Sequence, residues 1–386
     1  MITMIHFERD EFDERRARLL DEMANRKLDA MLLFSQESMY WLTGYDSFGF
    51  CFFQCLVLKS DGEMQLLTRS ADLRQARHTS ILEAIVIWRD RGNADPVIEL
   101  RNLLGDMGLL GARIGVEWLT HGLTGQAGLG VNERLGSFAA LKDASDLVPM
   151  LRAVKSEAEI AYVREAALLA DEAFEEALPL IVPGADEAEI LAAMQGHVLK
   201  RGGDYPANPF IVGSGRDALL CRYKSGRRRL DASDQLTLEW AGVKAQYHAA
   251  LMRTVILGEP TDRHLELHAA AREALSAVEA VMRPEHSFGD VFDAHAAVME
   301  EHELVRHRLS ACGYSLGARY APSWMDMPMF HVGNQAVIQP NMTLFAHMII
   351  MDSDTGTAMT LGRTYLTTET EPEPLSRLSL DLTVVR

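Results

Sequence analysis

The hydrophobic pattern of residues 1–149 alternates between helix-like and strand-like segments. Residues 8–26 repeat apolar side chains at the spacing of an amphipathic helix. The apolar runs 28–33 and 51–59 have the length of buried strands, and the second is followed by a turn signal and a return strand at 64–68. Segments of both kinds alternate to the end of this region, so we expect a mixed α/β domain.

A helix start marks the beginning of the second half of the chain. Ser156 is a good N-cap and Glu159 occupies the capping-box position, which predicts a helix that runs to about residue 179. We place the domain boundary just before this helix, so that the expected domains are 1–149 and 150–386. Further helices are predicted at 186–201, 265–282 and 288–301.

The stretch 235–254 contains a carboxylate, Glu239, inside an apolar run. Two short apolar runs separated by Gly242 predict a β-hairpin or a bent strand pair. Glu239 lies inside the first run, so its carboxylate is expected to be mostly buried. Burial of a carboxylate is unfavourable unless the group is paired or has a function. Glu239 is therefore either a catalytic group or a structural carboxylate paired with a buried cation such as Arg253.

Composition and charge narrow the class of protein. The chain has 386 residues, of which 48% are hydrophobic and 24% charged, as expected for a globular protein of two domains. Its net charge of −17 disfavours nucleic acid and anionic membrane as partners. The charged N-terminus predicts no signal peptide, and scattered free thiols fit a reducing cytoplasm. The cysteines are Cys51, Cys55, Cys221 and Cys312, and the first two are expected in the core.

Three phrases resemble the pita-bread family of creatinase, prolidase, aminopeptidase P and methionine aminopeptidase. They are Trp41-Leu-Thr-Gly-Tyr45, the segment from Arg152 to Ile160, and Tyr247 followed by Arg253-Thr254. The first phrase belongs to an N-terminal domain that methionine aminopeptidases lack, so the resemblance is to the creatinase and aminopeptidase P branch. It implies an α/β fold of two domains: a small creatinase-type domain, then a pita-bread domain with helices packed on a curved antiparallel sheet. It also implies a homodimer with an active site shared between subunits.

The resemblance implies five metal-binding positions, and at each of them this chain has a residue different from the family's ligand. Peptidases of the family bind metal through carboxylates and a histidine, and these positions fall here on Glu239, Ala250, Tyr314, His347 and Gly362. A methyl group cannot ligate a cation, and Glu239 and His347 alone cannot make a dinuclear site. We therefore predict that no metal or other cofactor is bound, and that any catalysis uses protein side chains.

The segments 41–46, 53–55, 202–207 and 238–242 are most similar to metal-free ectoine hydrolase, whose attacking glutamate coincides with Glu239. The catalytic histidine of ectoine hydrolase and creatinase falls on Arg222 or Tyr223, and neither is a histidine. For His248 and His347, a hydrogen-bonded structural role remains an open alternative to proton transfer. The candidate catalytic residues are Glu239, His248, His347 and Tyr223. The candidate substrate-binding residues are Tyr45, Phe48, Asp204, Tyr205, Arg222, Tyr247 and Tyr314.

Three functions follow from these patterns. The first is a metal-independent hydrolase that cleaves a C–N bond of a small polar compound, either an ectoine-like cyclic amidine or a creatine-like guanidino acid. Glu239 would then act as nucleophile or general base. The second is an Xaa-Pro dipeptidase or aminopeptidase of the metallopeptidase type. The third is a degenerate member that binds a small molecule without turnover.

Overall fold

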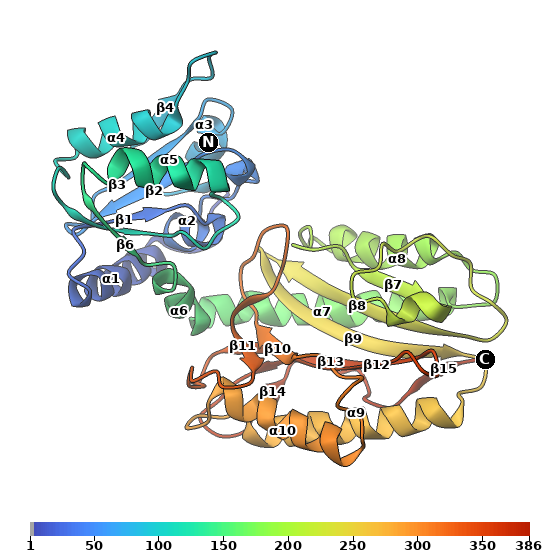
Figure 1. The fold of residues 1–386 in the computed structure, drawn as a ribbon. Coiled ribbons are helices and arrows are strands. Elements are labelled where there is room, and N and C mark those ends of the chain that lie inside the picture. The colour runs from blue at the N-terminus through green and yellow to red at the C-terminus, as the bar shows by residue number, and fades with distance from the viewer. Residues whose placement is uncertain (1–3) are drawn as a thin grey trace. The chain divides into compact units, whose positions relative to one another are not determined.

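The computed structural model describes residues 4–386. The chain divides into two compact units on either side of the bond between Arg152 and Ala153. Each unit has its own sheet and its own helices (Figure 1). None of the helices in the described residues is both long and apolar enough to cross a membrane.

Residues 4–152 fold around a six-stranded sheet in the order β4-β3-β2-β1-β5-β6. Strands β1, β2 and β3 pair antiparallel, whereas β4, β5 and β6 each run parallel to their neighbours. The strands are β1 (Ala30–Leu33), β2 (Cys55–Lys59), β3 (Met64–Arg69), β4 (Ile85–Trp88), β5 (Arg113–Val116) and β6 (Ala140–Asp143). The helices are α1 (Arg9–Asn25), α2 (Gln36–Thr43), η1 (Gly49–Cys51), α3 (Leu73–Thr79), α4 (Pro96–Asp106), α5 (Gly125–Leu135) and α6 (Leu147–Ala153).

The mixed α/β character expected for this half is confirmed, but one strand is shorter than its apolar run. The run 51–59 begins with the end of a 3-10 turn, Gly49–Cys51, so that β2 starts only at Cys55. Cys55 is buried as expected, whereas Cys51 is exposed, and the prediction that Cys51 belongs to the core was wrong. The run is longer than the strand because Cys51 belongs to the turn and residues 52–54 connect the turn to β2.

The second unit begins with the helix that the capping residues predict. Ser156 Oγ accepts the amide N–H of Glu159, and the Glu159 carboxylate accepts the amide N–H of Ser156. This reciprocal capping satisfies two N–H groups that a helix start would otherwise leave unpaired. The helices of the unit are α7 (Glu157–Ala177), η2 (Leu178–Leu180), α8 (Glu187–Lys200), η3 (Gly215–Leu219), α9 (Asp262–Val281) and α10 (Phe288–Glu301).

Residues 153–386 contain a sheet of nine strands, seven of which follow the order β11-β10-β12-β13-β9-β8-β7. Pairing is antiparallel along this path, and β14 and β15 pair with β13 and β9. The strands are β7 (Ile211–Ser214), β8 (Asp234–Lys244), β9 (Tyr247–Leu257), β10 (Ala311–Ser315), β11 (Asp326–His331), β12 (Thr343–Asp352), β13 (Thr357–Leu366), β14 (Glu373–Pro374) and β15 (Thr383–Val385). Helix α7 packs on β8 and β9, and α9 packs on β12 and β13 (Figure 1).

The predicted hairpin is formed by β8 and β9, but its turn is not at Gly242. The turn residues are Ala245 and Gln246, which both have positive φ angles, as a tight two-residue hairpin turn requires. Gly242 lies inside β8, where a Cβ atom would stand 1.9 Å from the carbonyl oxygen of Ala166 in α7. Glycine is present there because α7 crosses the strand at close range.

Candidate functional site

A cavity of the C-terminal unit lies on the sheet face that points away from α7 and α9. On β8, the indole of Trp240 points toward the helices and donates to the carbonyl oxygen of Ala170 in α7. Because side chains alternate along a strand, the neighbouring Glu239 points to the opposite face. A cavity of about 500 Å³ opens there, and Glu239, Tyr314 and His347 line it. The rest of its lining includes Asn208, Pro209, Ile211, Cys221, Arg222, Tyr223, Leu309, Trp324, Met325, Met329 and Ile349.

Strand register explains why residues distant in sequence share this face. Residues paired across adjacent strands point to the same side of a sheet. The pairs form one row across β7, β8, β9, β13 and β12, made of Ile211, Glu239, Met252, Gly362 and His347. Tyr314 of β10 pairs with Phe345, two residues from His347, so it joins the same face. The sheet thus brings together three of the predicted site residues from β8, β10 and β12.

Glu239 is a buried carboxyl group without a hydrogen-bond partner in residues 4–386. Its side chain is 7% exposed. Burial raises the pKa of Glu239 to about 7, against a smaller opposing effect of the Arg222 cation. Arg253 does not pair with it: its guanidinium points to the helix side and donates to the carbonyl oxygens of Met252 and Gly362. The alternative of a structural Glu239–Arg253 pair is therefore wrong.

His347 and Tyr314 are the other polar groups on the cavity floor. Burial lowers the pKa of His347 to about 3, so its imidazole is neutral near pH 7, and its buried Nδ1 has no hydrogen-bond partner in the described chain. Burial, with the nearby Glu239 charge, raises the pKa of Tyr314 well above its usual value, so its hydroxyl stays protonated. The two rings lie 5.5 Å apart between centroids. A neutral imidazole and a protonated phenol can both donate hydrogen bonds to a ligand.

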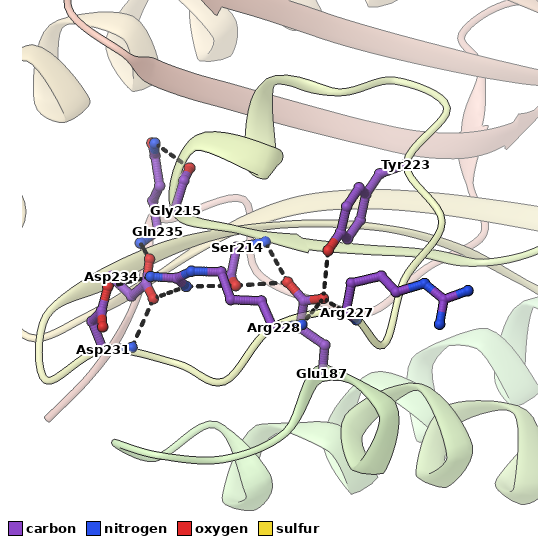
Figure 2. Close-up of polar contacts among 9 residues, drawn as sticks. All are labelled: Glu187, Ser214, Gly215, Tyr223, Arg227, Arg228, Asp231, Asp234 and Gln235. Atoms are coloured by element: carbon purple, nitrogen blue, oxygen red, sulfur yellow. Dashed lines mark hydrogen bonds and ion pairs between the residues drawn. The ribbon is translucent and has the colours of Figure 1, made fainter.

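A loop anchored on Glu187 supplies one wall of the cavity. The fully buried Glu187 carboxylate accepts hydrogen bonds from the amide and hydroxyl of Ser214, the hydroxyl of Tyr223, and the amides of Arg227 and Arg228 (Figure 2). The Tyr223 hydroxyl is thus bound to Glu187, at 3.0 Å, while its ring lines the cavity. Tyr223 is therefore part of the cavity wall, and its hydroxyl donates its hydrogen bond to Glu187 and not to Glu239.

Arg222 is the cation of this wall. Its side chain is exposed, forms no ion pair within the described residues, and donates from Nη1 to the carbonyl oxygen of Cys221 at 2.9 Å. Its charge acts on Glu239 and His347 across the cavity, lowering the pKa of each. An exposed guanidinium at a cavity wall can bind a carboxylate through two parallel hydrogen bonds.

Several predicted site residues of the second unit lie behind or beside the cavity. The Tyr247 hydroxyl donates to the Glu159 carboxylate at 2.6 Å, which ties β9 to the start of α7. His248 is fully buried, and its Nε2 accepts the amide N–H of Ala207 at 3.0 Å. Asp204 and Tyr205 line a second cavity of about 450 Å³, which shares Asn208, Pro209 and Pro322 with the first.

Tyr45 and Phe48 belong to the N-terminal unit and differ in exposure. Tyr45 is fully buried there, and its hydroxyl donates to Gln54 Oε1 at 3.1 Å. Tyr45 was expected to bind substrate, but its side chain is buried within this unit, where Gln54 gives its hydroxyl a buried partner. Phe48 is 84% exposed.

Sequence reasoning missed Trp324, Asn208 and Cys221. Trp324 is fully buried, and its indole N–H donates to the Tyr314 hydroxyl at 2.9 Å. It lies in an irregular segment before β11, where no strand or helix period marks a side chain as buried. The only signal was a tryptophan in a stretch rich in proline.

The family metal positions do not fit a dinuclear metal centre here. Ala250 and Gly362 offer no ligand atom, and the Tyr314 oxygen accepts from Trp324. A Cβ atom at Gly362 would meet the ring of Phe345 at 2.8 Å, so the phenyl ring fills the space of the missing carboxylate. Among the described residues, only His307, Asp352 and Asp354 bring three potential ligand atoms together, and both carboxylates pair with arginines instead.

Comparisons with known proteins agree with this architecture. The profile of metallopeptidase family M24 matches residues 161–369, and that of the creatinase/prolidase N-terminal domain matches residues 15–154. Ectoine hydrolase of Halomonas elongata is 28% identical over 356 residues, covering 87% of this chain and 88% of the relative.

Solved structures show the same fold at lower identity. Dipeptidase PepE from Mycobacterium ulcerans superposes with a TM-score of 0.86 at 20% identity, covering 98% of this chain and 99% of that one. A prolidase from Thermococcus sibiricus gives a TM-score of 0.87 at 16% identity, covering 97% and 99%. The two-domain fold, with a creatinase-type first domain and a pita-bread second domain, is thereby confirmed. The chain belongs to metallopeptidase family M24, a family of hydrolases.

Proposed function

We propose that this protein is a metal-independent hydrolase that cleaves a C–N bond of a small polar compound, with Glu239 as nucleophile or general base. The observation that carries the proposal is a buried carboxyl group with no partner in the described residues, at the floor of a cavity, with a pKa of about 7. A base is most effective when its pKa lies near the working pH. A carboxylate that the fold holds buried and unpaired is destabilising, which is typical of functional sites.

The donor set supports the metal-independent form of the proposal. Of the five family metal positions, only Glu239 and His347 carry groups that ligate divalent cations readily, and they occupy β8 and β12, with β9 and β13 between them. The space between them on this face is taken by Met252 and by the Phe345 ring over Gly362. A catalytic zinc site needs three protein ligands as a rule. The hydrolytic step would therefore use protein side chains alone.

In the general-base form of the reaction, ionised Glu239 takes a proton from water, and the oxygen of that water attacks the amidine or guanidino carbon of the substrate. The C–N bond then breaks, and the leaving nitrogen takes up the proton. In the nucleophilic form, the Glu239 oxygen attacks this carbon first, and the C–N bond breaks as the leaving nitrogen takes a proton from solvent. Water then hydrolyses the resulting acyl-imidate intermediate, which releases the Glu239 carboxylate. Tyr314 and neutral His347 would donate hydrogen bonds to the substrate, and Arg222 would bind a substrate carboxylate.

An assay of the purified protein tests this function. The panel contains ectoine, creatine and an Xaa-Pro dipeptide, each with and without EDTA and with added Mn²⁺. We expect hydrolysis of an amidine or guanidino acid that EDTA leaves unchanged, and no stoichiometric metal by elemental analysis. Dipeptide hydrolysis that needs Mn²⁺ and disappears with EDTA would contradict the proposal and favour the metallopeptidase alternative, which shares the family and the fold.

We also propose that two copies of the chain associate and that Phe48 lies in their interface. Phe48 is 84% exposed, and Phe52 in the same loop is 51% exposed. Large exposed aromatic side chains are typical of protein interfaces. Light scattering of the wild type should give the mass of a dimer, and Phe48→Asp should shift it toward a monomer. A monomeric wild type at micromolar concentration would contradict the association.

A further inference from the structure

The hydroxyl group of Tyr314 has one hydrogen bond in the described chain, and in it the oxygen is the acceptor. The indole Nε1–H of Trp324 donates to this oxygen at 2.9 Å. A phenol hydroxyl can accept and can also donate its own proton. No acceptor for the Tyr314 proton occurs among residues 4–386, and Tyr314 lines the cavity that also contains Glu239. The proton is therefore available to a group that enters the cavity.

The indole of Trp324 is held in place from several sides. Its side chain is fully buried, and its backbone N–H donates to Asn208 Oδ1 at 3.0 Å. The His248 ring lies 6.2 Å away between centroids, and this histidine is in turn fixed by the amide N–H of Ala207. Phe210 packs on the indole at 6.3 Å. These contacts leave the indole N–H little freedom to point elsewhere.

The ring of Tyr314 is fixed as firmly as its partner. Phe345 meets it edge-on at 5.5 Å between centroids, and the tilted His347 ring lies at the same distance. With ring and oxygen both held, rotation about the C–O bond is the remaining freedom of the hydroxyl. The indole occupies the acceptor side of the oxygen, so the O–H bond is directed away from it. A donor on the oxygen also polarises the O–H bond and strengthens its donation.

We infer that Trp324 is a positioning residue of the active site, which holds the Tyr314 hydroxyl as a hydrogen-bond donor to the reacting group of the substrate. This inference deepens the proposed function and rests on it for its catalytic part. The donor role itself is a property of the free protein. It also gives a function to His248, which supports the indole from behind and does not line the cavity.

Two single variants and their combination test the inference. Tyr314→Phe removes the donor, and a loss of roughly 100-fold or more in kcat is expected, as for other donors to a developing oxyanion. Trp324→Phe keeps the aromatic ring and removes one hydrogen bond, for which roughly a fivefold to tenfold loss in kcat is expected. In the double variant the loss should equal that of Tyr314→Phe alone, because Trp324 acts only through Tyr314. Losses that multiply in the double variant would overturn the inference.

A matched control separates positioning from stability. Trp240 is also fully buried and donates its indole N–H, but to the carbonyl oxygen of Ala170 on the helix side. Trp240→Phe should therefore lower the melting temperature about as much as Trp324→Phe while leaving kcat within about twofold of the wild type. An equal loss of kcat in both variants would show that Trp324 has only a structural role.

A spectroscopic measurement on the free protein tests the inference without substrate and without turnover. The ratio of the tyrosine Fermi doublet in ultraviolet resonance Raman spectra reports whether a phenol oxygen accepts a hydrogen bond. The difference spectrum between the wild type and Tyr314→Phe isolates Tyr314 from the other tyrosines. An acceptor-type ratio is expected, falling in Trp324→Phe. A donor-only ratio in the wild type would refute the inference even if Trp324→Phe did not fold. Inactivity of the wild type on every substrate would count only against the proposed function.

Discussion

Replacement of Glu239 by glutamine should make the protein more stable at neutral pH while it removes activity. The pKa of Glu239 is raised from 4.5 to about 7 by burial. A carboxyl group with a raised pKa in the fold opposes folding once it ionises. Stability is unaffected by Glu239 below about pH 4.5, falls as the pH rises from about 4.5 to 7, and stays reduced above that.

The size of this effect follows from the pKa. A tenfold change in an ionisation constant is worth about 1.4 kcal/mol, so the rise corresponds to roughly 3 kcal/mol at pH 8. The amide of Glu239→Gln has nearly the same shape but no charge, and it replaces a group that already lacks partners in the described residues. We expect the variant to melt roughly 5–10 °C higher than the wild type at pH 8, and at the same temperature near pH 4.

Thermal unfolding followed by circular dichroism at several pH values measures this difference, and a turnover assay measures the loss of activity. A nucleophile or base at the reacting centre should lose at least roughly 100-fold in kcat when it becomes an amide. A carboxylate in a buried ion pair would behave in the opposite way, because breaking the pair destabilises a protein by roughly 3–5 kcal/mol. A variant that melts lower at pH 8 and keeps its activity would refute the reasoning.

Three further predictions follow from contacts around the site. The value of kcat/KM should rise with pH and level off above about 7, since Glu239 must be ionised to act; a profile that falls over this range would exclude it as base or nucleophile. Gly242→Ala should lower stability by roughly 1–3 kcal/mol in denaturant titrations, because its Cβ would stand 1.9 Å from the Ala166 carbonyl oxygen. The control Gly196→Ala, in α8 with open space around it, should raise stability by roughly 0.5–1 kcal/mol. Glu187→Gln should raise KM more than it lowers kcat, because the wall loop loses its anchor; an unchanged KM would show that the loop holds its shape without it.

Local signals in the sequence determined the elements of this protein. Ser156 and Glu159 lie three residues apart and satisfy each other's N–H groups, so the start of α7 can be predicted from the sequence alone. The apolar runs on either side of Gly242 predict two strands, and the position of Glu239 inside the first run predicts a buried carboxylate; both occur. The missing metal ligands at Ala250 and Gly362 can be recognised from the sequence alone, because neither side chain contains an atom that can bind a metal.

Tertiary structure alone decided which side chains share the cavity. Tyr205 and Tyr314 were both expected to bind substrate, but only Tyr314 lies on the sheet face that carries Glu239, and Tyr205 lines the neighbouring cavity. The Trp324 contact with Tyr314 and the Phe345 ring over Gly362 depend on strand register and on an irregular segment. Such contacts join residues that no periodic pattern connects, because register and chain crossings are set by the packing of the whole sheet.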